Sequence, residues 1–249
     1  MNSSFTTLSI GCNLVFDVRF HLNQKNRPIV ILSSGYAPGS FDDPLPVALI
    51  NLFESSNLSW AQYIYPERDE RNGVKDLLIS SGLSALKAVC EWAKRNGFKE
   101  IAFYGVSFGA NITLEIALLE PATFVILVNP VFNYYDYRCK QLGEKMMNDW
   151  QENGVIDIHY KESTVKTYYR FIEEAINQDL FNRAVSIETK VLAMQGAKDE
   201  RLSVNDINVL GRKAKSWYPV ILPQGEHSIR DLETIKLITH EISLFIDKA

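Results

Sequence analysis

Short runs of apolar residues alternate along this chain with longer segments in which apolar and polar residues mix. Each run has the length of a strand, and unbroken apolar character is typical of strands buried on both faces of a parallel sheet. The runs lie at residues 28–32, 60–65, 101–104, 124–128, 190–195 and 218–222. Ahead of all six runs, residues 8–22 place apolar side chains at roughly every second position, which predicts an opening hairpin or paired strands.

The segments between these runs have the spacing of amphipathic helices. Residues 74–96 carry apolar side chains at spacings of one, three and four, and Gly97 follows as a helix C-cap. Further helices are expected at residues 45–55, 110–119 and 231–246. Strands that alternate with helices predict an α/β protein with a mostly parallel central sheet and helices on both faces. We expect one domain over residues 1–249.

Residues 131–186 interrupt the alternation. The segment is helical in character and too long for one crossover connection, so we expect a helical cap inserted into the α/β domain. Its aromatic residues include Tyr134, Tyr135, Tyr137, Trp150, Tyr160, Tyr168, Tyr169, Phe171 and Phe181. Some of these must form the cap's own core, and we expect Tyr134, Tyr135 and Tyr169 to line a substrate pocket.

Composition and charge exclude several classes of protein. The 249 residues are 46% hydrophobic and 22% charged, which excludes a disordered or collagen-like chain, and a net charge of −4 argues against a dedicated nucleic-acid-binding protein. No apolar run approaches the ~20 residues of a membrane span, and residues 1–7 lack a secretory-signal pattern. The three cysteines are scattered and suggest no disulfide framework, so we expect a cytoplasmic location.

The segment Gly105-Val106-Ser107-Phe108-Gly109 fits the pattern G-x-S-x-G. Such a short pattern arises by chance, but here an expected strand precedes it and an expected helix follows, as the motif requires. In that setting the serine occupies a tight strand-to-helix turn, and glycines flank it because side chains would collide there. The turn holds the hydroxyl beside the free N–H groups of the helix N-terminus. We therefore expect Ser107 to be a nucleophile.

A serine nucleophile needs a base, and the base needs a carboxylate that orients it. Of the four histidines, only His227 is expected in a loop directly after a sheet strand, from which it can reach the serine. Asp199 is expected in the loop after the strand at residues 190–195, and it is our candidate acid. Glu200 is the rival acid, and Asp206 lies further along the chain.

The elbow at residues 105–109, the spacing from Gly196 to Asp199 and the turn from Gly225 to His227 together resemble the α/β-hydrolase superfamily. The resemblance extends from about residue 28 to residue 248. Within the superfamily, the chain is most similar to small capped acyl hydrolases of the serine-aminopeptidase-like group, which includes cinnamoyl esterases and acyl thioesterases. The resemblance implies an α/β-hydrolase fold with a helical cap insertion.

The resemblance also implies an oxyanion hole formed by two backbone N–H groups, those of Phe108 and Tyr36. The sequence departs from the group at two loops. Residues 34–36 read Ser-Gly-Tyr where the group usually has His-Gly, although a backbone donor from Tyr36 does not depend on that histidine. Residues 65–71 carry charges where the group often has a Gly-x-Gly turn, and we expect these charges to be solvated.

These residues predict a serine hydrolase that cleaves a carboxylic ester or thioester through an acyl-enzyme. Two alternatives remain open: an acyltransferase that uses the same acyl-enzyme, and a non-catalytic ligand-binding protein of the same fold. Motifs for nucleotide phosphates, dinucleotides and catalytic zinc are absent, so no cofactor and no metal is expected. The expected partner is a small-molecule acyl ester or thioester, with no nucleic acid and no membrane span. The sequence does not indicate an oligomeric state.

Overall fold

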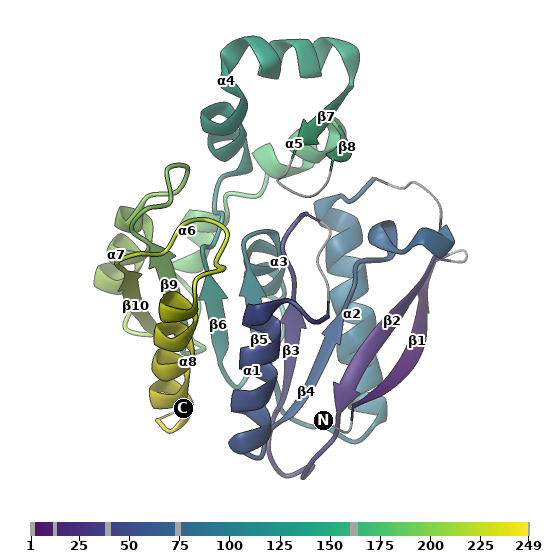
Figure 1. Cartoon of the computed structure of the whole chain (residues 1–249), viewed down its shortest axis with the longest axis vertical. Coiled ribbons are helices and arrows are strands. Elements are labelled where there is room, and N and C mark those ends of the chain that lie inside the picture. Colours follow the sequence, from purple (N-terminus) through teal and green to yellow (C-terminus); the bar gives the residue numbers. More distant parts are fainter. Residues whose placement is uncertain (1–2, 12–13, 38–40, 73–75, 160–163, 249) are drawn as a thin grey trace.

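The computed structural model describes residues 3–11, 14–37, 41–72, 76–159 and 164–248. Its centre is an eight-stranded sheet in the order β1-β2-β4-β3-β5-β6-β9-β10 (Figure 1). The strands are β1 Ser4–Ile10, β2 Leu14–His21, β3 Ile29–Ser33, β4 Ser59–Tyr63, β5 Ile101–Val106, β6 Val125–Val128, β9 Val191–Gly196 and β10 Trp217–Leu222. β1 and β2 form the expected antiparallel hairpin, β2 pairs antiparallel with β4, and all other neighbours are parallel. The prediction of a mostly parallel sheet is therefore confirmed.

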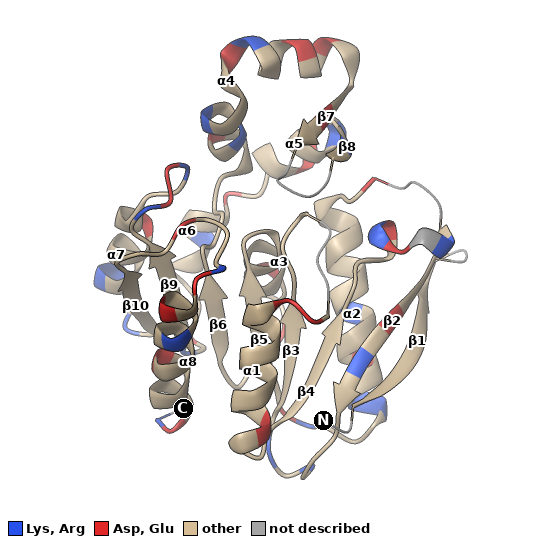
Figure 2. Ribbon diagram, in the orientation of Figure 1, with Lys and Arg blue, Asp and Glu red and all other residues tan. Residues whose placement is uncertain are grey.

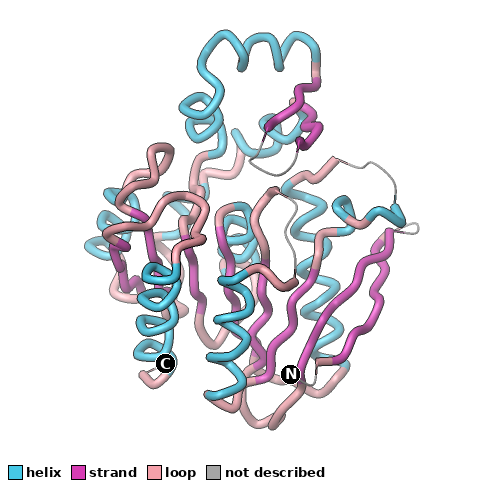
Figure 3. Tube along the Cα trace, in the orientation of Figure 1, coloured by secondary structure: helices cyan, strands magenta, loops and turns pink. Residues whose placement is uncertain are grey.

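Helices cover both faces of this sheet (Figure 3). α1 Pro44–Ser55 and α8 Leu232–Ile246 pack on one face, and α2 Ile79–Arg95, α3 Phe108–Ala117 and α7 Val204–Lys213 pack on the other. Alternate residues of β3 show why its sequence is apolar throughout. Ile29 and Ile31 lie in the core beneath α2 and α3, whereas Val30 and Leu32 lie in the core beneath α1 and α8. Figure 2 shows that the central strands β3, β5 and β6 carry no charged residues.

The helix expected at residues 74–96 is shorter in the structure. α2 begins at Ile79 because Leu78 is extended, and the Leu78 N–H donates to Ser81 Oγ at 3.0 Å, which starts the helix there. Residues 73–75 lie outside the described residues. At the other end Gly97 has the left-handed φ of +91° that a helix-ending glycine adopts, as expected. Between β4 and α2, the 3₁₀ helices η1 Pro66–Arg68 and η2 Glu70–Asn72 occupy the charged loop.

The segment expected to form a cap lies between β6 and β9. It contains α4 Tyr134–Asn153, β7 Val155–His159, β8 Thr164–Tyr168, α5 Arg170–Ile176 and α6 Leu180–Ala184. In Figure 1, α4, α5 and the β7–β8 pair stand beyond the carboxyl ends of the parallel strands. We call residues 131–186 the cap.

The antiparallel β7–β8 pair was not expected from the sequence, which predicted only helices here. Its inner face is small: Ile158, Val165 and Thr167 are buried, and the Trp150 indole N–H donates to the carbonyl oxygen of Thr167 at 3.0 Å. Five-residue strands with one buried face have too short an alternation to be separated from helix by pattern alone. Among the described residues, no helix is long and apolar enough to cross a membrane.

Candidate active site

The turn between β5 and α3 holds Ser107 in a strained backbone conformation. Its φ of +53° and ψ of −113° lie outside the regions that non-glycine residues favour, at a cost of roughly 1–3 kcal/mol. Strain of this kind persists only where the surroundings impose it. Here the Ser107 N–H donates to the carbonyl oxygen of Val128 on β6 at 2.9 Å, which ties the turn to the neighbouring strand.

The two glycines of the motif are required by close backbone approach. A Cβ on Gly105 would lie 2.4 Å from the carbonyl oxygen of Gly109, and a Cβ on Gly109 would lie 2.2 Å from the carbonyl oxygen of Ser33. Both distances are far inside van der Waals contact, and both partners are backbone atoms that cannot rotate away. The glycines thus let α3 start directly against β5 and against the end of β3.

Ser107, His227 and Asp199 form a continuous hydrogen-bonded chain. Ser107 Oγ lies 2.9 Å from His227 Nε2, and His227 Nδ1 lies 2.7 Å from Asp199 Oδ2. With the Nδ1 proton directed at the carboxylate, Nε2 is left to accept the hydrogen bond from the serine hydroxyl. The Asp199 side chain is fully buried, the His227 side chain is 14% exposed and Ser107 is half-buried. The series of hydrogen bonds therefore runs from the interior toward solvent.

Asp199 is held as a carboxylate by several donors. Its Oδ1 accepts from the N–H groups of Arg201 and Leu202, and its Oδ2 accepts from Gln195 Nε2 as well as from His227. Burial alone raises the pKa of Asp199, but the hydrogen bond and charge of His227, together with the two backbone donors, outweigh it and leave the pKa below its usual value. The group is therefore ionised at neutral pH.

The rival residues lie elsewhere. Glu200 is exposed, and no hydrogen bond joins it to His227 among the described residues. Asp206 lies half-buried in the first turn of α7. Of the other histidines, His159 is exposed on β7 and pairs with Thr164 Oγ1, and His240 is exposed on α8. The geometry therefore singles out Asp199 and His227.

The loop after β3 lies beside Ser107. A Cβ on Gly35 would be 3.8 Å from the Cβ of Ser107, so residues 34–36 border the turn. The Tyr65 hydroxyl donates to the carbonyl oxygen of Ser34 at 3.2 Å, and Arg68 Nε donates to that of Tyr36 at 3.3 Å. These two contacts support the loop in which the expected histidine is missing. On the other side, Phe108 is the first residue of α3, where N–H groups have no acceptor within the helix.

The three cap tyrosines selected from the sequence occupy different places. Tyr134 is buried, and its ring centroid is 6.2 Å from that of Phe108, so it packs on the side chain of the residue that follows the serine. Tyr135 is 41% exposed, and the nearby Cys139 thiol raises the pKa of its hydroxyl. Tyr169 packs edge-on against Trp150 within the cap. Among the described residues, no ring contact or hydrogen bond joins Tyr135 or Tyr169 to Ser107 or His227.

Tyr137 on α4 contacts His227, the middle member of the hydrogen-bonded series. Its ring centroid lies 5.2 Å from that of His227, and its hydroxyl accepts a hydrogen bond from Arg201 Nη1 at 3.0 Å. Lys140, one turn further along α4, donates to the carbonyl oxygen of Arg201 at 3.2 Å. The cap is therefore attached to the same loop that carries Asp199. The sequence included Tyr137 among the cap aromatics but offered no reason to prefer it to Tyr135; Tyr160, another of them, lies outside the described residues.

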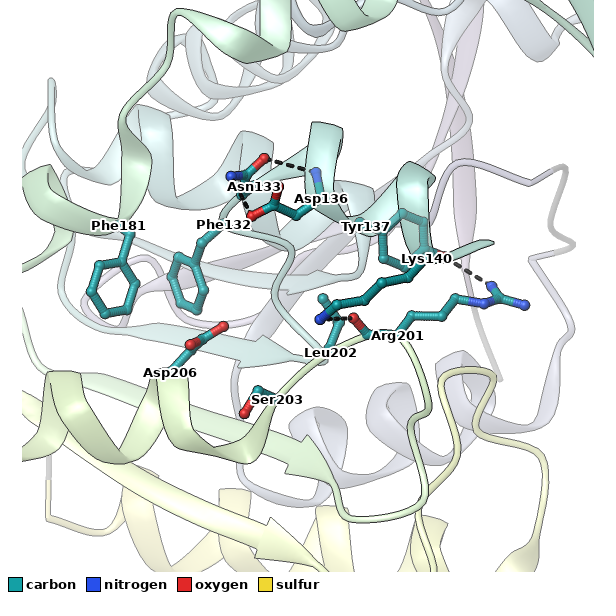
Figure 4. Close-up of a pocket in the computed structure, with 10 residues that line it drawn as sticks. All are labelled: Phe132, Asn133, Asp136, Tyr137, Lys140, Phe181, Arg201, Leu202, Ser203 and Asp206. Carbon is teal, nitrogen blue, oxygen red and sulfur yellow. Dashed lines mark hydrogen bonds between the residues drawn. The ribbon is translucent and has the colours of Figure 1, made fainter. Parts of the chain in front are cut away.

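A cavity of about 280 Å³ opens beside Tyr137, between the cap and the loop after β9 (Figure 4). Phe132 and Phe181 form its apolar side, with ring centroids 5.6 Å apart. Lys140, Arg201 and Asp206 are among its polar residues. Burial raises the pKa of Asp206, although nearby Lys140 opposes the shift. Figure 4 shows the two rings on one side and the two basic side chains on the other.

No cluster of three or more histidine, cysteine or acidic side chains in the described part of the chain could hold a metal ion.

Asn129, which sequence reasoning missed, bonds to the backbone of both the Asp199 and the His227 loops. The signal in the sequence that could have identified Asn129 is its position, as a polar residue directly after an apolar strand.

Comparison with solved structures identifies the fold. The chain is similar to alpha/beta hydrolase domain-containing protein 10 from mouse, with 17% identity, a TM-score of 0.82, and coverage of 98% of this chain and 99% of that one. It is also similar to Est1E from Butyrivibrio proteoclasticus, with 18% identity, a TM-score of 0.78, and coverage of 97% and 98%. A third similar structure is the esterase domain of a Rhodothermus marinus protein, with 11% identity, a TM-score of 0.72 and 98% coverage of both chains.

The chain has the α/β-hydrolase fold, and the fold predicted from the sequence is confirmed. No protein-family model matches the sequence, and no curated protein sequence matches it significantly.

Proposed function

We propose that this protein is a serine hydrolase that cleaves a carboxylic ester or thioester. The observation that carries the proposal is the hydrogen-bonded chain from Ser107 through His227 to Asp199, with distances of 2.9 and 2.7 Å. A serine hydroxyl is a weak nucleophile unless a base accepts its proton, and a histidine oriented by a buried carboxylate is such a base. Some of the similar solved structures are esterases, which agrees with the proposal.

The proposed reaction proceeds in two halves. Ser107 Oγ attacks the acyl carbon while its proton passes to His227 Nε2, and Asp199 stabilises the imidazolium that results. His227 then gives the proton to the departing alcohol or thiol, which leaves an acyl-enzyme. A water molecule, deprotonated by His227, attacks the acyl-enzyme and releases the acid and the free serine. No step needs a cofactor.

The backbone N–H groups of Phe108 and Tyr36 are the proposed donors to the oxyanion. Phe108 supports the proposal because it begins α3, where N–H groups point away from the helix. Tyr36 supports it because its loop borders Ser107, and because Tyr65 and Arg68 hold the carbonyls of that loop. Donors fixed in advance cost no reorganisation when the charge develops.

The cavity beside Tyr137 is the proposed place for the leaving group. His227 must deliver its proton to the leaving atom, so the leaving group departs on the His227 side of the scissile bond. Tyr137 contacts the His227 ring and also lines the cavity. A volume of about 280 Å³ is just below the range of drug-sized ligand pockets, which favours a compact leaving group with an apolar face against Phe132 and Phe181.

Turnover of a substrate panel tests the proposal. The panel comprises p-nitrophenyl esters of increasing acyl length, a feruloyl ester and acyl thioesters. Ser107→Ala should lose at least ~10³-fold in kcat, since only binding and oxyanion contacts then remain. Ser84→Ala, which removes an exposed hydroxyl on α2, is the matched control and should keep wild-type turnover. A folded wild-type protein that turns over no member of the panel, or a Ser107→Ala variant as active as wild type, would contradict the proposal.

A further inference from the structure

Asn129 is the residue that directly follows β6, and it is completely buried. Its φ is +48°, in the left-handed region that few residues other than glycine adopt. Asparagine is among the exceptions, because its short polar side chain tolerates this conformation. A buried polar residue in an unusual conformation needs a compensating set of hydrogen bonds, and Asn129 has one.

The side-chain amide of Asn129 bonds to two separate loops. Its Oδ1 accepts from the N–H of Gly196 at 2.9 Å, at the start of the loop that carries Asp199. Its Nδ2 donates to the carbonyl oxygens of Glu226 and His227, both at 2.9 Å. Its backbone N–H donates to the carbonyl oxygen of Met194 at 2.8 Å. The amide thus connects the loop of the proposed acid to the backbone of the proposed base.

The same strand end also holds the serine. The carbonyl oxygen of Val128, the residue before Asn129, accepts the Ser107 N–H at 2.9 Å. Two consecutive residues at the end of β6 therefore contact the segments of all three members of the chain. β6 lies between β5, which precedes Ser107, and β9, which precedes Asp199, so its end is adjacent to both.

The position requires an amide in particular. One atom must accept a hydrogen bond while another donates two, and only the side-chain amides of asparagine and glutamine offer both. Aspartate has no donor when ionised and would face two carbonyl oxygens. Glutamine has one more methylene, and its side chain does not share the tolerance of asparagine for a left-handed backbone.

We propose that Asn129 is a positioning residue that sets the distance and orientation of His227 relative to Ser107 and Asp199. The inference rests on the proposed function for its catalytic meaning. Asn129 holds the peptide carbonyl of His227 itself, so its loss lets the imidazole shift while the loops remain joined. Direct backbone bonds, from Ala197 N–H to the Leu222 carbonyl and from Lys198 N–H to that of Gly225, keep the loops together without Asn129.

The test compares Asn129→Gly with Asn57→Gly. Glycine accepts a positive φ, so Asn129→Gly removes the amide without adding backbone strain. Asn57 is an exposed residue with φ of +54° just after α1, and its replacement makes the same backbone change away from Ser107, His227 and Asp199. Asn129→Asp is the second variant, because it keeps the size of the side chain and one acceptor while it removes the donors. Each variant is measured for kcat, for KM and for the proton resonance of the His227 Nδ1–H in ¹⁵N-labelled protein.

We expect Asn129→Gly to lower kcat by about 10²-fold with little change in KM, because misplacement of a catalytic group by an ångström costs about that much. The Nδ1–H resonance should broaden or disappear in Asn129→Gly and Asn129→Asp and should persist in Asn57→Gly. A kcat within about threefold of the Asn57→Gly value, together with an unchanged resonance, would overturn the inference. Failure of the proposed function has a different signature, because wild type would then lack turnover while the resonance still reports whether Asn129 positions His227.

Discussion

At the carboxyl edge of the sheet, backbone segments approach one another closely, whereas the cap is assembled mainly from side chains. A Cβ on Gly109 would lie 2.2 Å from a carbonyl oxygen, and a Cβ on Gly196 would lie 2.3 Å from the carbonyl oxygen of Gly225. In the cap, a Cβ on Gly143 or Gly154 would meet nothing within 4 Å. At the edge a collision with backbone atoms requires glycine, whereas at Gly143 and Gly154 only the positive φ favours it.

The polar groups of the two regions differ in the same way. At the edge, Asp199 accepts from two backbone N–H groups and Asn129 donates to two backbone carbonyls. The cap contacts the edge through long side chains: the ring and hydroxyl of Tyr137, and the amine of Lys140, which donates to the carbonyl oxygen of Arg201. Groups that are hydrogen-bonded to the backbone hold the fixed geometry that catalysis requires. A surface formed by side chains can be altered by substitution, and the substrate that fits it then changes.

The largest expected effect distinguishes two adjacent acids at the edge. Asp199→Asn is nearly isosteric, but the amide favours the wrong tautomer of His227, so kcat should fall by up to ~10⁴-fold. Glu200→Gln is the matched control, and because Glu200 is exposed it should leave kcat near wild type. Steady-state kinetics on one p-nitrophenyl ester measure both. The assignment of the acid is wrong if Glu200→Gln is the damaging change and Asp199→Asn is not.

The next effect concerns stability and compares one glycine from each region. Gly109→Ala forces a methyl group against the Ser33 backbone and should lower the free energy of unfolding by about 3 kcal/mol. Gly154→Ala places its methyl in open space at a φ of +73°, so only backbone strain of about 1 kcal/mol remains. Urea unfolding followed by circular dichroism gives both values. Equal losses would remove the distinction between the regions.

A smaller effect is expected in the cap cavity. Phe181→Ala removes one of the two phenylalanine side chains of the cavity and should raise KM for compact aryl leaving groups by about tenfold, equivalent to about 1.4 kcal/mol. The methyl ester of the same acid does not reach the cavity, so its KM should stay the same and serves as the internal control. An equal change in KM for both esters would place the leaving group elsewhere.

The smallest effect is the pH dependence that Asp199 contributes to stability. Burial raises the pKa of Asp199, but the hydrogen bonds from His227 and from backbone N–H groups lower it by more than burial raises it. The pKa therefore lies below its usual value. A carboxyl with a lower pKa when folded stabilises the fold above its unfolded pKa of about 3.9, and this contribution is lost as pH falls through the folded pKa. The stability difference between wild type and Asp199→Asn should therefore narrow as pH falls from about 5 to about 3. Urea unfolding across this range checks it, and a constant difference contradicts it.

The contrast between the two regions also explains what the sequence could predict. Gly105, Ser107 and Gly109 could be interpreted because backbone collisions restrict the residue types at the turn, and strand ends placed Asp199 and His227 at the same edge. The sheet followed from apolar runs that are buried on both faces. By contrast, Tyr137 could not be separated from Tyr135, because a shift of two residues along α4 turns a side chain from the edge to solvent.

Asn129 escaped prediction for a related reason. Its role depends on hydrogen bonds to loops that lie 67 and 98 residues further along the chain, and a single asparagine carries no spacing pattern. The β7–β8 pair was missed because its two strands have five residues each and little buried surface. Long-range contacts and short elements are where local patterns carry the least information.

The most direct test of the central claim is covalent labelling of the serine. A fluorophosphonate probe reacts with a serine whose hydroxyl is activated by a neighbouring base, and peptide mapping by mass spectrometry identifies the residue that carries the label. The proposed mechanism predicts a single label on Ser107 in folded wild-type protein, no label in Ser107→Ala, and slower labelling in Asp199→Asn. A folded wild-type protein that stays unlabelled, or a label on another serine, would contradict it.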